Sequence, residues 1–448
     1  MFYYLDPFGC AKNQVDAEII MARLNEAGWT GCSPAEADLI IVNSCGFIEE
    51  AKRESINAVI AWKKQYPDKK ILLSGCLTER YRNELETSLD EADGFMGLME
   101  SDRSAEIAAE LFNSPRNKPA IPQRSGRQIK FFPKKFQRQG TIGERPLLGF
   151  PGSAYVKISE GCNNCCTFCA IPLIRGPLRC RSVSDIVSEC KALLSRNVKE
   201  ICLIGQDLAS YAQLAVLLEA IADLKGNFWV RLLYLHPDHF PLDILDVVEK
   251  DNRFLPYFDI PIQHASRHIL SAMGRNGDGK SYLTLLDKIR SRLPDAVIRS
   301  TFLVGFPGET EKDFSLLLDF QKKARFDWLG VFTFSREEGT AAYSMKERVS
   351  KKIARERKTI IEELQIPITE KRMNRFIGRT MDVLVEEEAA DGLWLGRAFC
   401  QAPEVDGAAV ICAPAATPGV VEPDTVKPGA LIQGTVVAQR GFDLEVRV

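Results

Sequence analysis

The chain has 448 residues, a length that predicts about three domains. Its 45% hydrophobic and 26% charged residues are typical of a folded globular protein, which excludes disordered and fibrous classes. Lys and Arg number 58 against 60 Asp and Glu, so the whole chain lacks the positive field that would attract nucleic acid or an acidic membrane.

The first seven residues lack the basic and apolar regions of a secretion signal, and no later stretch approaches about 18 uninterrupted apolar residues. We therefore expect a cytoplasmic protein with no membrane partner. Thirteen cysteines, an odd number, then favour reduced thiols used for metal binding or catalysis over a disulfide framework.

Short apolar runs alternate with helical stretches in the first hundred residues, which is the βαβ pattern of a parallel sheet. The expected strands are residues 2–5, 39–42 and 71–73, and the expected helices are residues 15–27 and 48–65. This predicts an open α/β domain over residues 1–112.

Residues 113–150 break this rhythm with several prolines and are expected to form a linker. The segment from Arg116 to Arg145 holds nine Lys or Arg residues against one acid, a local charge of +8. Such a linker can dock on RNA or on an acidic neighbour, or its charges can simply be solvated.

Six further strand candidates, each followed by helical or loop sequence, predict an incomplete (β/α)6 barrel over residues 151–345. They are residues 154–158, 200–204, 229–235, 258–262, 298–304 and 329–334. Residues 346–375 are expected to form a charged helical connector. Five short strands separated by Gly and Pro turns then predict a small antiparallel β-barrel, similar in size to an OB fold, over residues 376–448.

A dense cysteine motif directly follows the first strand of the expected barrel. Cys162, Cys166 and Cys169 have the spacing C-x3-C-x2-C, and Cys165 is a fourth cysteine nearby. A zinc site remains an alternative, although it usually takes two well separated cysteine pairs. A ferredoxin cluster takes four cysteines, so three at this spacing would leave one iron of a four-iron cluster open to a chelating substrate.

Three dispersed cysteines form a second pattern. Cys10, Cys45 and Cys76 each lie just after an apolar run and are separated by 35 and 31 residues, about one βα repeat each. The carboxyl ends of neighbouring parallel strands gather ligands, so the three thiols could converge. Three buried structural cysteines are the alternative. The neighbouring glycines favour convergence because they allow backbone to approach a bulky group closely.

Motifs in all three expected domains resemble the methylthiotransferase family of radical S-adenosylmethionine (radical SAM) enzymes. The motifs are Gly9-Cys10-Ala11-Lys12-Asn13, Asn43-Ser44-Cys45-Gly46-Phe47, Gly75-Cys76, the Cys162/Cys166/Cys169 loop with Phe168, residues 301–310 and residues 334–340. The last domain resembles a TRAM domain. The resemblance implies S-adenosyl-L-methionine (SAM) and two 4Fe-4S clusters, one on Cys162, Cys166 and Cys169 and the other on Cys10, Cys45 and Cys76.

The same resemblance implies the reaction. One SAM methylates sulfur on the N-terminal cluster, a second is cleaved to a radical that removes a substrate hydrogen, and the carbon radical then couples to the methylated sulfur. An external electron donor is required. For SAM contacts we expect Phe168, Gly205, Gln206, Gln263, Arg275 and Gly305. Each of the polar residues could instead be solvated only.

Several segments favour the RimO-type branch, which implies methylthiolation of an aspartate β-carbon in the small-subunit ribosomal protein S twelve, free or on the assembled ribosome. They are Lys12-Asn13, Gly205-Gln206-Asp207, Leu233-Tyr234-Leu235, residues 259–264 and residues 402–407. The alternatives are a tRNA adenosine methylthiotransferase and an RNA-binding protein with structural clusters. Cys165, Cys180 and His236 depart from the usual family residues.

The charge of the last domain supports the protein branch independently. Residues 376–448 contain five basic and eleven acidic side chains. RNA binding requires Lys and Arg to neutralise phosphates, so this domain is better suited to a basic ribosomal protein. The alternative is an acidic barrel that contacts nothing.

Overall fold

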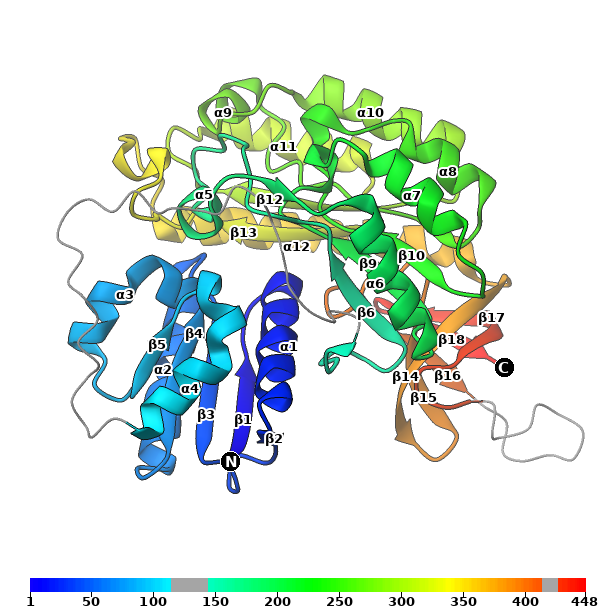
Figure 1. Cartoon of the computed structure of the whole chain (residues 1–448). Coiled ribbons are helices and arrows are strands. Elements are labelled where there is room, and N and C mark those ends of the chain that lie inside the picture. Colours follow the sequence, from blue (N-terminus) through cyan, green and yellow to red (C-terminus); the bar gives the residue numbers. More distant parts are fainter. Residues whose placement is uncertain (114–143, 413–425) are drawn as a thin grey trace, which may run out of the picture.

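The computed structural model describes residues 1–113, 144–412 and 426–448 (Figure 1). Residues 114–143, most of the expected basic linker, lie outside the described residues, as do residues 413–425 of the last domain. No helix in the described ranges is long and apolar enough to span a bilayer.

The N-terminal unit is an open, parallel five-stranded sheet in the order β2-β1-β3-β4-β5. Its strands are β1 (Phe2–Pro7), β2 (Thr30–Gly31), β3 (Leu39–Ser44), β4 (Lys70–Gly75) and β5 (Gly94–Met96). Its helices are α1 (Ala11–Glu26), α2 (Glu49–Gln65), α3 (Cys76–Ser88) and α4 (Ser104–Asn113), with a 3-10 turn η1 (Leu98–Arg103). All six residues of β3 are buried because helices cover both faces of the sheet.

The second unit is a parallel six-stranded sheet in the order β13-β12-β11-β10-β9-β6, which leaves β6 and β13 as open edges. Its strands are β6 (Ser153–Lys157), β9 (Glu200–Ile204), β10 (Trp229–Leu232), β11 (Phe254–Asp259), β12 (Val297–Val304) and β13 (Trp328–Thr333). The longer helices are α6 (Val183–Ser195), α7 (Leu214–Ala222), α8 (Ile244–Lys250), α10 (Gly279–Arg292) and α11 (Glu311–Ala324). The short elements are α5 (Ile171–Arg175), α9 (Arg267–Ala272) and the hairpin of β7 (Ser159–Glu160) and β8 (Arg179–Cys180). This confirms the expected incomplete barrel.

Helix α12 (Lys351–Met373) lies in the expected connector but packs against β13 as the last outer helix of the barrel. Gln365 Nε2 donates to the carbonyl of Phe326 at 2.8 Å, and Thr369 Oγ1 donates to that of Asp327 at 2.8 Å. The buried carboxylate of Asp327 also pairs with Arg372 and Arg375 at 2.8 and 2.5 Å. Tertiary hydrogen bonds therefore anchor a helix whose sequence is mostly charged.

The C-terminal unit is a closed five-stranded barrel in the order β14-β15-β16-β18-β17, as expected. Its strands are β14 (Thr380–Ala390), β15 (Leu393–Ala398), β16 (Ala409–Cys412), β17 (Leu431–Arg440) and β18 (Asp443–Arg447). All pairs are antiparallel except β16 with β18, which is parallel. Figure 1 shows this barrel and the N-terminal unit on one side of the six-stranded sheet, opposite helices α7, α8, α10 and α11.

One apolar cluster joins the three units. Ala11, Val15 and Ile19 of α1 share it with inward-facing strand residues of the six-stranded sheet and with core residues of the C-terminal barrel. Polar contacts reinforce this contact surface. The fully buried Glu200 of β9 pairs with Arg231 of β10 at 2.8 Å and with Arg397 of β15 at 2.6 Å.

Of the alternatives for the linker cations, Arg145 follows the one in which they dock on acidic neighbours. Its side chain is fully buried, where it pairs with Glu18 of α1 at 2.7 Å and with Glu189 of α6 at 2.5 Å. The guanidinium also donates to the carbonyl of Tyr155 at 2.5 Å. Two carboxylates from two units therefore hold this cation inside the contact surface, and composition alone could not reveal them.

Candidate metal centres

The three dispersed cysteines come together at the carboxyl edge of the N-terminal sheet. Cys10 precedes α1, Cys45 follows β3 and Cys76 begins α3, and β1, β3 and β4 are neighbours in the sheet. The Asn13 Oδ1 atom lies 3.9 Å from Cys10 Sγ and 3.2 Å from Cys76 Sγ. The convergence follows from three successive parallel βα units.

A glycine allows these loops to meet. A Cβ atom built on Gly46 would lie 2.7 Å from the backbone of Cys76, so any side chain there would push the two loops apart. The close approach is thus between the cysteine loops themselves, which brings Cys45 beside Cys76. This refines the sequence argument, in which the glycines allow backbone to approach a bulky ligand.

The charges around the N-terminal trio differ from thiol to thiol. Desolvation would raise the pKa of Cys10, but the charges of Lys12 and Arg175 outweigh it and lower that pKa. Burial raises the pKa of Cys76 to about 12, although Arg175 opposes this shift. Burial also raises the pKa of Cys45. Because metal ligands must be deprotonated, binding of a metal group at this site would release protons.

Arg175 connects this trio to the barrel. It ends α5, which begins two residues after Cys169, and it is buried in the contact with the N-terminal unit. Its guanidinium donates to Asn13 Oδ1 at 2.8 Å and to Cys76 Sγ at 3.2 Å. It also pairs with Asp16 of α1 at 3.0 Å and with Glu160 of β7 at 2.7 Å. The sequence carried no signal for this role.

The second trio lies on the loop after β7. The amide of Cys169 donates to the carbonyl of Cys166 at 3.1 Å, and the amide of Asn164 donates to Cys162 Sγ at 3.4 Å. Burial raises the pKa of Cys166, and the Arg275 guanidinium opposes this through its charge and a hydrogen bond. Burial raises the pKa of Cys169 to about 12.

Both trios consist of cysteine thiols, the residue type that holds iron–sulfur clusters. Among residues 1–113, 144–412 and 426–448, no group of three Cys, His, Asp or Glu side chains is arranged to bind one metal ion. A cluster needs a wider arrangement because each thiolate binds a different iron, and thiolate is the usual ligand of such clusters. Cys165 and Cys180 are exposed, and Cys165 Sγ lies 3.8 Å from the carbonyl of Asn163 in its own loop.

The polar residues expected to contact SAM lie around the second trio with unused hydrogen-bonding groups. Gln206 Nε2 donates to Glu160 Oε1 at 3.3 Å, whereas its buried Oε1 has no partner in the described part of the chain. Arg275 Nη1 donates to the carbonyl of Pro261 at 2.7 Å, whereas its buried Nε is likewise without a described partner. Buried polar atoms are normally satisfied, so these atoms suggest a polar ligand.

The remaining expected SAM residues have mainly backbone and packing contacts. Gln263 has a positive φ of 71°, and its amide donates to the carbonyl of Thr301 at 2.7 Å. Phe168 packs against a small apolar cluster that includes Phe306. A Cβ on Gly205 would lie 2.6 Å from Ser159 Oγ, and one on Gly305 would lie 2.5 Å from Ala354 Cβ. The close approach at Gly305 is therefore to α12.

A polar network missed by the sequence reasoning holds the cysteine loop to the sheet. Asp207 accepts from Asn164 Nδ2 at 2.9 Å and contacts His239 Nε2 at 2.7 Å. Burial would raise the pKa of Asp207, but these hydrogen bonds lower it to about 2. His236 stacks on His239 with a centroid distance of 4.6 Å. The position of Asp207, three residues after the end of β9, was the available signal.

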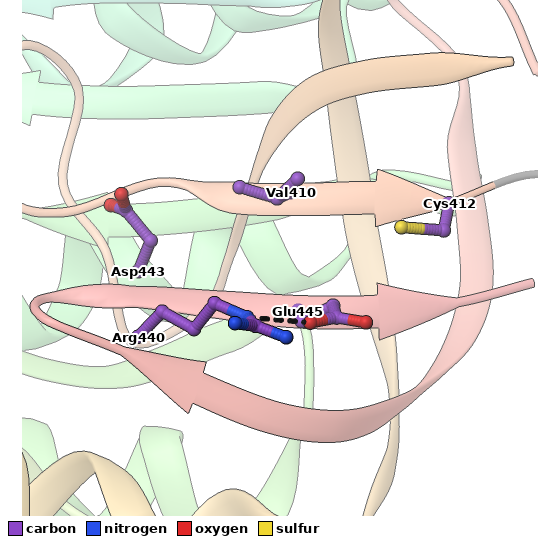
Figure 2. Close-up of a pocket in the computed structure, with 5 residues that line it drawn as sticks. All are labelled: Val410, Cys412, Arg440, Asp443 and Glu445. Atoms are coloured by element: carbon purple, nitrogen blue, oxygen red, sulfur yellow. Dashed lines mark hydrogen bonds and ion pairs between the residues drawn. The ribbon is translucent and has the colours of Figure 1, made fainter.

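A hollow on the described surface lies away from both trios. It has a volume of about 240 Å³ on the C-terminal barrel and is lined by Val410, Cys412, Arg440, Asp443 and Glu445 (Figure 2). Arg440 and Glu445 pair across it at 3.0 Å. Neither cysteine trio contributes to it, so we do not connect this hollow with the metal centres.

Comparisons with known proteins agree with this geometry. Residues 3–97 match the family described as "Uncharacterized protein family UPF0004", residues 156–320 the Radical SAM superfamily, and residues 377–448 the TRAM domain. A radical SAM methyltransferase, TsrM from Kitasatospora setae, has a similar fold: its TM-score is 0.54 at 15% identity, covering 74% of this chain and 72% of that chain.

Curated relatives cover nearly the whole chain. A protein named "Ribosomal protein uS12 methylthiotransferase RimO" from Treponema denticola is 46% identical, covering 98% of this chain and 99% of the relative. Proteins of the same name from Aquifex aeolicus and Thermotoga maritima are 40% and 39% identical, covering 89% of this chain and 88% and 91% of their own lengths. The chain therefore belongs to the RimO family of radical SAM methylthiotransferases and is an enzyme that uses SAM and a 4Fe-4S cluster.

Proposed function

We propose that this enzyme attaches a methylthio group to the β-carbon of an aspartate in ribosomal protein uS12 and that it holds two 4Fe-4S clusters. Cys162, Cys166 and Cys169 hold the cluster that serves SAM. Cys10, Cys45 and Cys76 hold the second cluster, at which sulfur is supplied. The name and near full-length similarity of the relatives support the substrate, and no comparison favours tRNA adenosine.

The observation that carries the two-cluster proposal is the short bridge between the trios. Helix α5 has five residues and is therefore about 8 Å long. Cys169 precedes its start by two residues, and Arg175 at its end contacts Cys76 Sγ at 3.2 Å. Two groups on either side of so short a helix can act on one substrate atom between them.

The chemistry requires such proximity because an aspartate β-carbon cannot be activated by acid or base at neutral pH. Bound together, SAM and its cluster supply an organic radical that can remove the hydrogen. The protein's own groups hold the reacting molecules in position and exclude water. Thr167 fixes the cysteine loop by donating from its amide to Met273 and from its hydroxyl to Ala272.

We further propose that six residues line the SAM pocket: Phe168, Gly205, Gln206, Gln263, Arg275 and Gly305. The uS12 substrate is bound either free or on the assembled small subunit, an external donor supplies electrons, and the proposed location is the cytoplasm. The acidic C-terminal barrel suits a basic ribosomal protein.

The test is anaerobic reconstitution of the protein with iron and sulfide, followed by incubation with SAM, a reductant and either ribosomal proteins or tRNA. Mass spectrometry should find one methylthio group in place of one hydrogen on a uS12 aspartate and no change in tRNA. Modification of tRNA adenosine with unmodified uS12 would contradict the proposal.

A further inference from the structure

Lys12 is a buried cation without a carboxylate partner. Its side chain is 9% exposed, and no carboxylate oxygen of the described residues lies within 4.0 Å of its ammonium nitrogen. The contact found is with the aromatic ring of Tyr234, whose centroid lies 3.3 Å from that nitrogen. A cation–π contact offsets only part of the cost of burying a charge.

Three other buried cations of the same contact surface pair with carboxylates. Lys157 meets Asp16 at 2.5 Å and Glu160 at 2.7 Å, and Arg175 meets the same two acids. Arg145 meets two other carboxylates. A buried charge normally requires such a partner. The surface therefore supplies carboxylates to these three cations, whereas the ammonium of Lys12 has the Tyr234 ring and the nearby Cys10 thiol but no carboxylate among the described residues.

The position of Lys12 relates it to the reaction. It follows Cys10 by two residues in the first turn of α1, and its aromatic partner Tyr234 follows β10 of the barrel. Lys12 therefore lies where the N-terminal trio meets the strand ends of the barrel. An aspartate whose β-carbon receives sulfur carries its carboxylate on the next carbon, so the group that holds this carboxylate must lie close to the sulfur site.

We propose that the Lys12 ammonium, supported by the Tyr234 ring, binds the side-chain carboxylate of the aspartate that is modified. This inference rests on the proposed function and names the contact that selects aspartate within it. The sulfur atoms already have another cation, since Arg175 contacts Cys76 Sγ. A role for Lys12 as a second counterion of the cluster, or as a partner of an RNA phosphate, is separated by the experiment below.

The experiment measures binding of two labelled uS12 peptides to the reconstituted enzyme by fluorescence anisotropy. One peptide carries the modified aspartate and the other carries asparagine in its place. The variants are Lys12→Met and Lys12→Arg. Lys69→Met is the matched control, because Lys69 also lies over a tyrosine ring, that of Tyr66 at 4.7 Å, but precedes β4 at the opposite edge of the sheet. Iron content, SAM cleavage and tRNA binding are measured on each protein.

The wild type should bind the aspartate peptide at least about tenfold more tightly than the asparagine peptide, because a buried charge pair is lost in the latter. Lys12→Met should bind both peptides as weakly as the wild type binds the asparagine peptide. Lys12→Arg should retain part of the preference for the aspartate peptide, and Lys69→Met should match the wild type. SAM cleavage should be unchanged, and each variant should keep its full iron, because Arg175 remains beside the N-terminal trio when the charge of Lys12 is removed.

Equal binding of the two peptides by the wild type would overturn the proposal without any variant. Loss of iron in Lys12→Met would make Lys12 a counterion of the cluster, and loss of tRNA binding would make it a phosphate partner; either result overturns it. If the wild type modifies uS12 but ignores the aspartate charge, only this inference fails. If it leaves uS12 unmodified, the proposed function fails as well.

Discussion

The guanidinium of Arg175 lies 3.2 Å from the sulfur of Cys76, although the two residues belong to different domains. Arg175 ends helix α5, which follows the loop of the second cysteine trio, and Cys76 is a member of the first trio. A single side chain thus connects the environments of both candidate metal centres. The domain contact is therefore part of the site, and loss of the contact should weaken iron binding by the cysteines.

Replacement of Arg175 by Met should destabilise the domain contact. It would remove one of the two cations that neutralise Asp16 and Glu160 inside the protein, a change that costs about 3 to 5 kcal/mol of unfolding free energy. Iron bound by the N-terminal trio should also fall. Denaturant unfolding and iron analysis measure both effects. Arg175→Lys should recover part of each, whereas a variant that unfolds and binds iron like the wild type would refute the assigned role.

Single cysteine variants should separate the two centres. Cys166→Ala should abolish SAM cleavage, because it removes a ligand beside Arg275. Cys10→Ala should retain SAM cleavage but yield no methylthio product. Chromatography of deoxyadenosine and mass spectrometry of uS12 report the two activities. Cys165→Ala is the control, because this exposed thiol points to its own loop. Wild-type product from Cys10→Ala would remove Cys10 from the ligand set.

A buried acid of the barrel, Glu337, should help to hold the N-terminal domain against the barrel. Glu337 is 2% exposed and pairs with Arg80 at 2.7 Å and Lys52 at 3.0 Å. Arg80 also donates to the carbonyl of Gly46, next to Cys45, at 3.0 Å. Glu337→Gln removes the carboxylate that pairs with Arg80 and leaves Lys52 with Glu49 at 3.1 Å, and should cost about 3 kcal/mol of unfolding free energy.

The same variant should make the region near Cys45 more sensitive to limited proteolysis. Glu338→Gln is the matched control, because Glu338 is exposed and only its backbone carbonyl accepts from Arg80. Equal proteolysis and equal stability of the two variants would show that Glu337 does not hold the domains together.

The sequence predicted the three-part architecture because its signals are local. Apolar runs marked strands such as β3 and β4, and cysteines directly after these strands were expected to converge, as they do. The short strands β2 and β5 gave no such signal, since two or three residues carry no periodicity. Helix α12 was expected only as a connector, because its contacts with Phe326 and Asp327 arise from tertiary structure.

The candidate site was predicted less completely than the fold. Cysteine spacing is a pattern along the chain, but the pairing of Arg145 with Glu18, or of Arg175 with Asp16, joins residues more than a hundred positions apart. Lys12 was noted only as part of a motif. That Lys12 lacks a carboxylate partner in the described part of the chain depends on where the fold places the surrounding acids, which the sequence does not show.

Glu200 provides a prediction on pH that does not depend on bound metal. Burial would raise its pKa, but the charges of Arg397 and Arg231 outweigh it and lower the pKa from 4.5 to about 2. The folded protein therefore keeps the carboxylate charged to lower pH than the unfolded chain does. The resulting stabilisation, on the order of 3 kcal/mol, is complete above pH 4.5 and is lost as pH falls toward 2.

Glu200→Gln should therefore show a smaller loss of unfolding free energy between pH 4.5 and 2 than the wild type does, and a lower stability at neutral pH. Urea unfolding at a series of pH values, followed by circular dichroism, measures this slope. Glu219→Gln, at an exposed position of α7, should follow the wild type. Identical slopes for Glu200→Gln and the wild type would contradict the assigned charge pairing.

The most direct measurement is iron and sulfide quantitation with Mössbauer spectroscopy on three anaerobically reconstituted proteins. These are the wild type, a Cys10/Cys45/Cys76→Ala triple variant and a Cys162/Cys166/Cys169→Ala triple variant. Two four-iron clusters predict about eight iron atoms in the wild type and about four in each triple variant. A wild type with only about four, or a triple variant that keeps its full iron, would contradict two clusters held by these two trios.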